Sequence, residues 1–188
     1  MKQQNQFTTK KIVLAALMAA LTVIGSSLRI TVPVDLVGTS SFHLGNIMCA
    51  LSGLLLGPWL GGLAAGLGSA IYDMLNPLYI SECWITFLLK GTYGLIAGLI
   101  AYRGKWAYGK AVLASSAAAM TYAVLYLAKG CFYDGMLLKG LTLPVALAAV
   151  LATKIPATVF NAVVAVIGAP ALAVAIRTAL KKSRLTLE

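Results

Sequence analysis

The sequence predicts an all-α integral membrane protein, a bundle of six transmembrane helices around an outward-facing pocket. Two features of its composition lead to this class: hydrophobic residues make up 60% of the 188 positions, and charged residues only 11%. A soluble domain has roughly half apolar and a quarter charged residues. The third feature is that apolar segments recur along the whole length, whereas a secretory signal would give one short segment near the N-terminus.

Six apolar segments are candidate spans, since about 20 residues cross a hydrocarbon core of roughly 30 Å. We expect one membrane domain over residues 1–188, with helices over residues 10–29, 44–57, 58–75, 83–102, 111–130 and 140–178. The second segment is short for a span. Gly57-Pro58 separates it from the third, because proline fits the first turn of a new helix and disrupts the interior of an old one. These two segments are predicted to form a helical hairpin whose ends lie on one side of the membrane.

The last segment is too long for one span, because at 1.5 Å per residue it would reach nearly twice across the core. We therefore expect a break near Pro156. Residues 137–152 would form a partly inserted helix or an ordered loop, and the final span would cover residues 155–178.

Basic residues form short clusters between the apolar segments, which is typical of membrane topology rather than of a nucleic-acid surface. Six spans place both termini on one side, together with Lys2, Lys10, Lys11, Arg103, Lys105, Lys110, Arg177, Lys181, Lys182 and Arg184. The acids at the opposite side are Asp35, Asp73, Glu82 and Asp134. The positive-inside rule then predicts cytoplasmic termini, and we expect no nucleic-acid partner despite the net charge of +10.

Polar residues recur at helical spacing in four of the segments and so share a face in each. The four sets are Ser69, Asp73 and Asn76; Glu82, Thr86, Lys90 and Tyr93; Tyr122, Tyr126 and Lys129; and Lys154, Thr158 and Asn161. Because polar side chains in spans usually face a bundle interior or a wet cavity, these faces predict one cavity that opens to the outside.

The residues expected to bind a ligand there combine rings for stacking, carboxylates that accept N–H groups, and amide or ammonium groups that donate. They are Asn46, Tyr72, Asp73, Asn76, Glu82, Trp84, Lys90, Tyr122, Tyr126, Lys129 and Asn161. Other interpretations remain open. Asp73, Glu82 and Lys129 also fit ordinary interfacial charges, and Trp84 fits an interfacial aromatic belt. Lys90 and Asn161 lie deeper and need a partner or a ligand.

Small residues repeat every four positions, which lets helices approach closely in lipid. The repeats include Gly53, Gly57 and Gly61; Gly62 and Gly66; Gly94 and Gly98; Ala15 and Ala19; and Ala16 and Ala20. Packing within the monomer and contact with a partner are both compatible with such repeats.

The sequence lacks the common motifs for ATP binding and for hydrolysis by a metalloprotease. It has no G-x-x-x-x-G-K-[ST] for nucleotide and no H-E-x-x-H for a metalloprotease, and its three scattered cysteines indicate neither disulfides nor a zinc site. We therefore expect no enzyme activity, no metal and no cofactor.

Several stretches resemble the substrate-binding S components of the energy-coupling factor (ECF) transporters, which are bacterial vitamin importers. These are "AALMAAL", "FHLGNIMCALSGLLLGPWLGGLAAGLGSAIYDML", "FLLKGTYGLIAGLIAY" and "KIPATVFNAVVAVIGAPAL", which together extend over nearly the whole chain. The resemblance is greatest to the branch with riboflavin-type and hydroxymethylpyrimidine-type members.

The resemblance implies a six-helix monomer in the bacterial cell membrane that captures a vitamin-like heterocycle from outside. It implies association with a membrane coupling subunit and two ATPases, with Ala15, Ala16, Ala19 and Ala20 at the contact with the coupling subunit. Hydroxymethylpyrimidine, a B6 vitamer, riboflavin and a queuosine-like base are all chemically acceptable substrates. The alternative is a self-sufficient oligomeric channel or facilitator, with the glycine repeats as the contact between its subunits.

Overall fold

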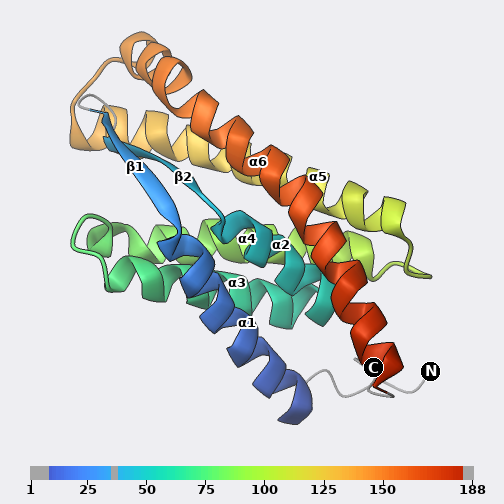
Figure 1. The fold of residues 1–188 in the computed structure, drawn as a ribbon. Coiled ribbons are helices and arrows are strands. Elements are labelled where there is room, and N and C mark those ends of the chain that lie inside the picture. Colours follow the sequence, from blue (N-terminus) through green and yellow to red (C-terminus); the bar gives the residue numbers. More distant parts are fainter. Residues whose placement is uncertain (1–8, 35–37, 184–188) are drawn as a thin grey trace.

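The structure, a computed structural model, describes residues 9–34 and 38–183. This part of the chain is mostly helical, with a two-stranded ribbon after the first helix (Figure 1). The helices are α1 (Thr9–Ser27), α2 (Gly45–Leu56), α3 (Pro58–Met74), α4 (Cys83–Ala101), α5 (Tyr108–Lys129) and α6 (Leu143–Lys182). A 3-10 turn, η1 (Ile80–Glu82), precedes α4, and a π-helical segment, η2 (Gly130–Leu138), continues α5. Three charges used to predict the topology, Lys2, Asp35 and Arg184, lie outside the described residues.

The expectation of an all-α fold is wrong between α1 and α2, in a stretch that lies almost entirely outside the predicted helices. Strands β1 (Arg29–Val34) and β2 (Gly38–His43) pair antiparallel there, with Arg29 opposite His43 in the register. The β-branched run Ile30, Thr31 and Val32 favours an extended backbone over a helix. The ribbon crosses one end of the bundle, from the end of α1 toward η2 and the start of α6 (Figure 1).

Helices α2 and α3 meet at Gly57-Pro58, where the sequence predicts a turn. Gly57 has φ of 82°, a conformation that costs glycine little, and Pro58 is the first residue of α3. Close packing requires the other glycines of this region. A Cβ on Gly53 of α2 would lie 2.2 Å from the carbonyl oxygen of Gly94 in α4, and a Cβ on Gly94 would lie 2.6 Å from that of Gly61 in α3. The glycine repeats therefore serve contacts within the monomer.

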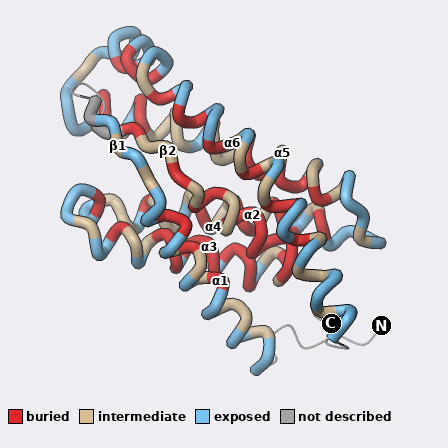
Figure 2. Tube along the Cα trace, in the orientation of Figure 1, coloured by how far each residue is buried: buried red, intermediate tan, exposed pale blue. Residues whose placement is uncertain are grey.

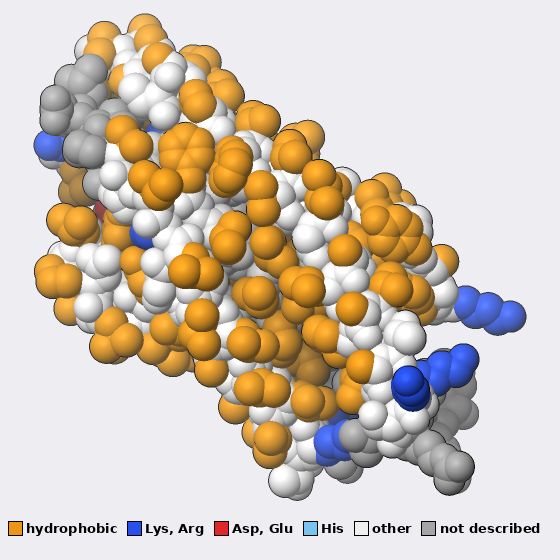
Figure 3. All heavy atoms as spheres, in the orientation of Figure 1, with side chains coloured by type: hydrophobic (Ala, Val, Ile, Leu, Met, Phe, Trp, Pro, Cys, Tyr) orange, Lys and Arg blue, Asp and Glu red, His pale blue; other side chains and the backbone are white. Residues whose placement is uncertain are grey.

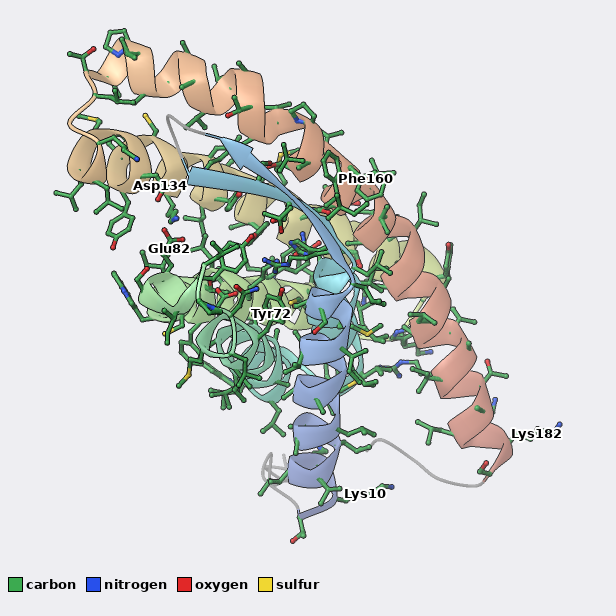
Figure 4. All side chains as sticks on the ribbon, turned by 60° about the vertical axis from the view of Figure 1, so that its left-hand side comes forward. Lys10, Tyr72, Glu82, Asp134, Phe160 and Lys182 are labelled. Carbon is green, nitrogen blue, oxygen red and sulfur yellow. The ribbon has the colours of Figure 1, made fainter. Side chains whose placement is uncertain are left out.

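The expected break near Pro156 is absent, because α6 is one continuous helix from Leu143 to Lys182 with Pro156 and Pro170 inside it. An interior proline removes one backbone hydrogen bond and crowds the preceding turn, which bends a helix without ending it. In Figure 4 the ribbon of α6 changes direction close to Phe160.

Four helical segments of the described residues are long and apolar enough to cross a membrane: Thr9–Ser27, Ile80–Ala101, Tyr108–Leu138 and Leu143–Lys182. Helices α2 and α3 have 12 and 17 residues. At 1.5 Å per residue α2 is about 18 Å long, well short of the hydrocarbon core. Six crossing helices therefore remain a prediction.

The core of the bundle is built from small side chains where helices meet. Cys49 and Leu54 of α2, Ala97 of α4, Ala118 of α5 and Ala165 of α6 are fully buried in one cluster. Figure 2 shows buried residues concentrated on α2 and on the inward faces of its neighbours, while the outer turns of α1 and α6 are exposed.

The two ends of the bundle differ in charge. In Figure 4 Lys10 and Lys182 lie at one end, and Glu82 and Asp134 lie at the other, which the β-ribbon crosses. Figure 3 shows several lysine and arginine side chains at the end where α6 finishes, with apolar side chains over much of the rest of the visible face. The ribbon end therefore carries the acidic side chains.

Candidate functional site

A cavity of about 160 Å³ lies at the ribbon end of the bundle, among side chains from both strands and from α3 to α6. Its lining is unusually polar for the interior of an apolar bundle. The lining residues are Arg29, Ser41, His43, Asp73, Leu78, Tyr79, Glu82, Ile85, Thr86, Leu89, Lys90, Tyr122, Tyr126, Lys129, Asp134, Lys154, Ala157, Thr158 and Asn161.

Most of the residues predicted to bind a ligand line this cavity, and four do not. The lining set contains Asp73, Glu82, Lys90, Tyr122, Tyr126, Lys129 and Asn161. Asn46 lies behind the cavity, next to Lys90. Asn76 donates from Nδ2 to the hydroxyl of Tyr72 at 3.2 Å, and Trp84 is 56% exposed and packs edge-on against Tyr133.

A chain of alternating charges forms one wall of the cavity. Lys129 of α5 lies 2.7 Å from Glu82 and 2.6 Å from Asp134, and Lys154 of α6 lies 2.7 Å from Asp134. In Figure 4 Glu82 and Asp134 lie near each other at the end of the bundle that the β-ribbon crosses. The two acids and two lysines balance, so this wall carries no net charge.

Lys90 of α4 is buried at 5% exposure and is held by two neighbours. Its ammonium donates to Oδ1 of Asn46 in α2 and lies 4.3 Å from the ring centroid of Tyr122 in α5. An ammonium has three N–H donors, so these contacts leave capacity for another acceptor on the cavity side. Asn46 therefore orients a binding group, although it does not itself line the cavity.

Asp73 of α3 supplies a further carboxylate of the lining. It is 5% exposed and lines the cavity, yet within residues 9–34 and 38–183 no lysine or arginine forms an ion pair with it. A buried carboxylate without a paired cation is costly unless hydrogen-bond donors satisfy it. The side chain of Thr86 hydrogen-bonds to Asp73, and the carboxylate keeps further acceptor capacity for a ligand.

Asn161 of α6 is already fully engaged with strand β2. Its Oδ1 accepts the N–H of His43 at 2.9 Å, and its Nδ2 donates to the carbonyl of Ser41 at 2.8 Å. The partner that this deep amide requires is therefore the backbone of the ribbon. Its side chain positions β2 over the cavity.

The ribbon is fastened on its other side by Arg29 and a cluster of hydroxyl groups. The Arg29 guanidinium lies 4.4 Å from the ring centroid of Tyr72 and 4.8 Å from that of Tyr79. The Tyr79 hydroxyl lies 3.1 Å from that of Thr31 and 3.2 Å from that of Ser41. These contacts tie both strands to the segment between α3 and α4.

His43 ends β2 and also lines the cavity. Burial lowers the pKa of its imidazole well below the usual value, and the positive charges of Lys90 and Arg29 lower it further. The ring is therefore neutral at pH 7 and adds no positive charge to the cavity.

Several lining residues were absent from the predicted set. Lys154 and Thr158 belong to a polar face that the sequence reveals, and Asp134 was placed only at the outer side. Arg29 gave no signal, because it ends the first apolar segment and comes over the cavity only when β1 folds back.

The four alanines predicted at a partner contact divide into two pairs. Ala15 and Ala19 are half-buried against the core, and a Cβ on Gly68 of α3 would lie 2.3 Å from the carbonyl oxygen of Ala19. Ala16 and Ala20 are exposed. The second pair is the more accessible to another protein.

An apolar helical bundle that encloses a polar cavity defines the class of helical membrane proteins with an internal solute-sized site. Within that class the chain belongs to the ECF-type riboflavin transporter S component family, whose sequence model matches residues 6–178. This is a family of transporter components rather than a class of enzymes, and membership agrees with the resemblance found in the sequence.

Two relatives each match one half of the chain. One is an uncharacterized protein in a gap 3' region of Pyrococcus woesei, 36% identical over 94 residues, which cover 50% of this chain and 60% of the relative. The other is a UPF0397 protein of Streptococcus gordonii, 33% identical over 94 residues, which cover 50% of this chain and 48% of the relative. The chain thus spans about half the length of the curated relatives it matches.

Proposed function

We propose that the chain is the substrate-binding subunit of an ATP-driven ECF importer, and that it captures a small vitamin-like heterocycle in the cavity beneath the β-ribbon. The observation that carries this proposal is the pair of Asp73 and Lys90, one acceptor and one donor that both line the cavity with no ion pair between them. Riboflavin, which the family description names, hydroxymethylpyrimidine, a B6 vitamer and a queuosine-like base are candidates.

The charge distribution supports a cavity that faces the outside of a cell membrane, with both termini cytoplasmic. Lys10 and Lys182 lie at the end opposite Glu82 and Asp134 (Figure 4), as the positive-inside rule requires for that orientation. Six crossings, with α2 and α3 packed as a hairpin between longer helices, complete this topology.

Release of the substrate into the cell would need partner subunits, because the sequence has no phosphate-binding loop with which to use ATP. We propose a membrane coupling subunit and two ATPases as these partners. The exposed alanines Ala16 and Ala20 of α1 form the accessible part of the surface proposed to meet the coupling subunit.

A self-sufficient channel or facilitator is the alternative function. Its predicted subunit interface was the set of glycine repeats, but Gly53, Gly61 and Gly94 face other helices of the same monomer. This packing favours the binding subunit.

The test is to compare binding and flux for the purified chain. Native mass spectrometry identifies any co-purified small molecule, and calorimetry measures its affinity for the wild type, Lys90→Met and a control on the same helix, Thr92→Ala. Thr92 donates only to the carbonyl of Leu88 on the exposed side. We expect loss of affinity in Lys90→Met alone and no flux into liposomes that contain only this chain. Solute flux through this chain alone would establish the facilitator instead.

A further inference from the structure

We infer that the substrate is a heterocycle with a single six-membered ring, which presents an N–H donor beside a ring nitrogen or carbonyl acceptor, rather than a fused three-ring flavin. This inference rests on the proposed function of the cavity as the capture site. It is carried by three independent features: the volume of the cavity, the carboxylate and the ammonium in its lining that form no ion pair, and the contacts of its tyrosine rings.

The volume suits one ring. The cavity measures about 160 Å³. An engineered protein cavity of about 150 Å³ holds benzene, whereas sites for larger, drug-sized ligands enclose about 300 Å³ or more. A six-membered ring with one or two small substituents therefore fills this space, and a flavin with its ribityl chain exceeds it.

The lining offers a ligand both an acceptor and a donor. Glu82, Lys129, Asp134 and Lys154 neutralise one another in the wall described above. The Arg29 guanidinium is held by the rings of Tyr72 and Tyr79 and donates to the carbonyl of Ser26. The carboxylate of Asp73 only accepts and the ammonium of Lys90 only donates, and both line the cavity without an ion pair. A heterocycle that carries an N–H group and an acceptor is matched to both groups.

A ligand that lacks either the N–H group or the acceptor leaves a buried charged group with one partner fewer. Without the N–H group, Asp73 keeps its hydrogen bond with Thr86 but gains no second donor. Without the acceptor, one N–H of Lys90 stays unmatched. A buried polar group without a partner carries the full free-energy cost of its removal from water. The site therefore binds such analogues more weakly. Selectivity therefore comes from the Asp73 and Lys90 pair.

The tyrosine rings do not form a free platform for a large aromatic system. Tyr122 stacks on Tyr126 with 5.7 Å between centroids and 13° between planes, and the ammonium of Lys90 lies against the Tyr122 ring. Lys154 lies 5.2 Å from the centroid of Tyr126. Tyr72, a further ring predicted to stack on the ligand, holds Arg29 instead. A small ring held by its polar edge needs no such platform.

A matched pair of ligands tests this inference. 4-Amino-5-hydroxymethyl-2-methylpyrimidine carries an amino group beside a ring nitrogen, and 5-hydroxymethyl-2-methylpyrimidine differs only in lacking that amino group. Calorimetry on the full chain in detergent measures both affinities and that of riboflavin. We expect the amino compound to bind at least about tenfold more tightly than its partner and than riboflavin.

Variants then assign the effect to residues. Asp73→Asn keeps the size of the side chain but removes its charge, and we expect the affinity ratio of the two pyrimidines to fall toward one. Lys90→Met should weaken both pyrimidines, and Thr92→Ala should change neither. Thermal unfolding of each variant shows that the fold is retained.

The possible failures separate the two proposals. Riboflavin bound as tightly as the aminopyrimidine overturns the single-ring inference and leaves the binding subunit standing. Equal binding of the two pyrimidines, or no binding of either, overturns the inference as well. Solute flux by the chain alone removes the proposed function itself.

Discussion

Asn161 of α6 hydrogen-bonds to the backbone of β2 at His43 and Ser41, as a neighbouring strand would. Its amide accepts the His43 N–H and donates to the carbonyl two residues earlier, at 2.9 and 2.8 Å. A sheet edge normally exposes such groups to pairing with other chains. Here one helical side chain covers this edge and fixes the height of the ribbon above the cavity.

Replacing Asn161 should loosen the ribbon more than it disturbs the helices. Asn161→Leu leaves the His43 N–H and the Ser41 carbonyl without partners, at a cost of about 1–3 kcal/mol for each buried group. Hydrogen exchange over residues 38–43 should rise, while Val163→Ala, an exposed neighbour on α6, should leave it unchanged. Unaltered exchange at His43 would contradict this role.

Asp134 should matter more to stability than Glu82, although both bind Lys129. The Asp134 side chain is 6% exposed and bridges two lysines, whereas that of Glu82 is 29% exposed and meets one. Asp134→Leu leaves buried cations unpaired and should cost about 3–5 kcal/mol of unfolding free energy. Glu82→Gln should cost about 1 kcal/mol or less. Thermal unfolding of the purified variants measures both.

A double substitution provides the control for that comparison. Asp134→Leu combined with Lys154→Met removes the more buried pair together and leaves the Glu82–Lys129 pair in place. The double variant should be more stable than Asp134→Leu alone, because only one lysine then lacks its former partner. Equal instability would show that packing, rather than charge, dominates at this position.

Substitution of two glycines on α4 distinguishes the effect of close packing on stability from the effect of helix propensity. A Cβ on Gly94 would lie 2.6 Å from the Gly61 carbonyl oxygen, whereas its nearest neighbour from Gly91 would be 3.5 Å away. Gly94→Ala should destabilise the protein by about 1–3 kcal/mol. Gly91→Ala should be neutral or stabilising by up to about 1 kcal/mol. Thermal unfolding of the two variants measures the difference. A similar loss of stability in both would contradict the close packing at Gly94.

The alanines of α1 should divide by function as they do by exposure. Ala16→Leu adds bulk to an exposed position and should impair uptake by the assembled importer while substrate affinity is kept. Ala19→Leu presses on α3 near Gly68 and should lower the unfolding temperature of the isolated chain. Uptake unaffected by Ala16→Leu would remove this part of α1 from the partner contact.

His43, the one histidine of the sequence, should make stability depend on pH. Because its pKa is lowered in the folded protein, the unfolded chain binds a proton first, near pH 6.5. The unfolding free energy should therefore fall as pH decreases below about 6.5, by up to about 1.4 kcal/mol per unit. His43→Gln should flatten the profile between pH 7.5 and 5.5, where carboxylates scarcely titrate. An unchanged slope would contradict a buried neutral ring.

The parts of the fold that follow from hydropathy and helix breakers could be predicted from the sequence. The apolar segments and the Gly57-Pro58 turn depend on local chemistry, so they are visible in a single sequence. The β-ribbon was missed because residues 29–43 form a short stretch whose β-branched residues are interrupted by Pro33, Asp35 and Gly38. The continuous α6 was missed because a proline bends a packed helix more readily than it ends one.

The polar faces of the helices predicted much of the cavity lining, because helical spacing brings those residues to one side. Spacing does not reveal which polar groups satisfy one another. Asn161 is occupied by β2 and Glu82 by Lys129, and only the three-dimensional arrangement distinguishes them from Asp73 and Lys90. Arg29 reaches the cavity because the chain reverses direction in the β-ribbon, and helical spacing does not predict that reversal.

The bend in α6 has a consequence for the surrounding lipid. Its 40 residues amount to about 60 Å of helix. The turns before the bend carry exposed leucines such as Leu147 and Leu151, so they favour lying along the headgroup boundary over projecting into water. We expect the protein then to occupy a wider footprint in the leaflet on the ribbon side than in the other. Such a shape would favour a locally deformed bilayer around each copy.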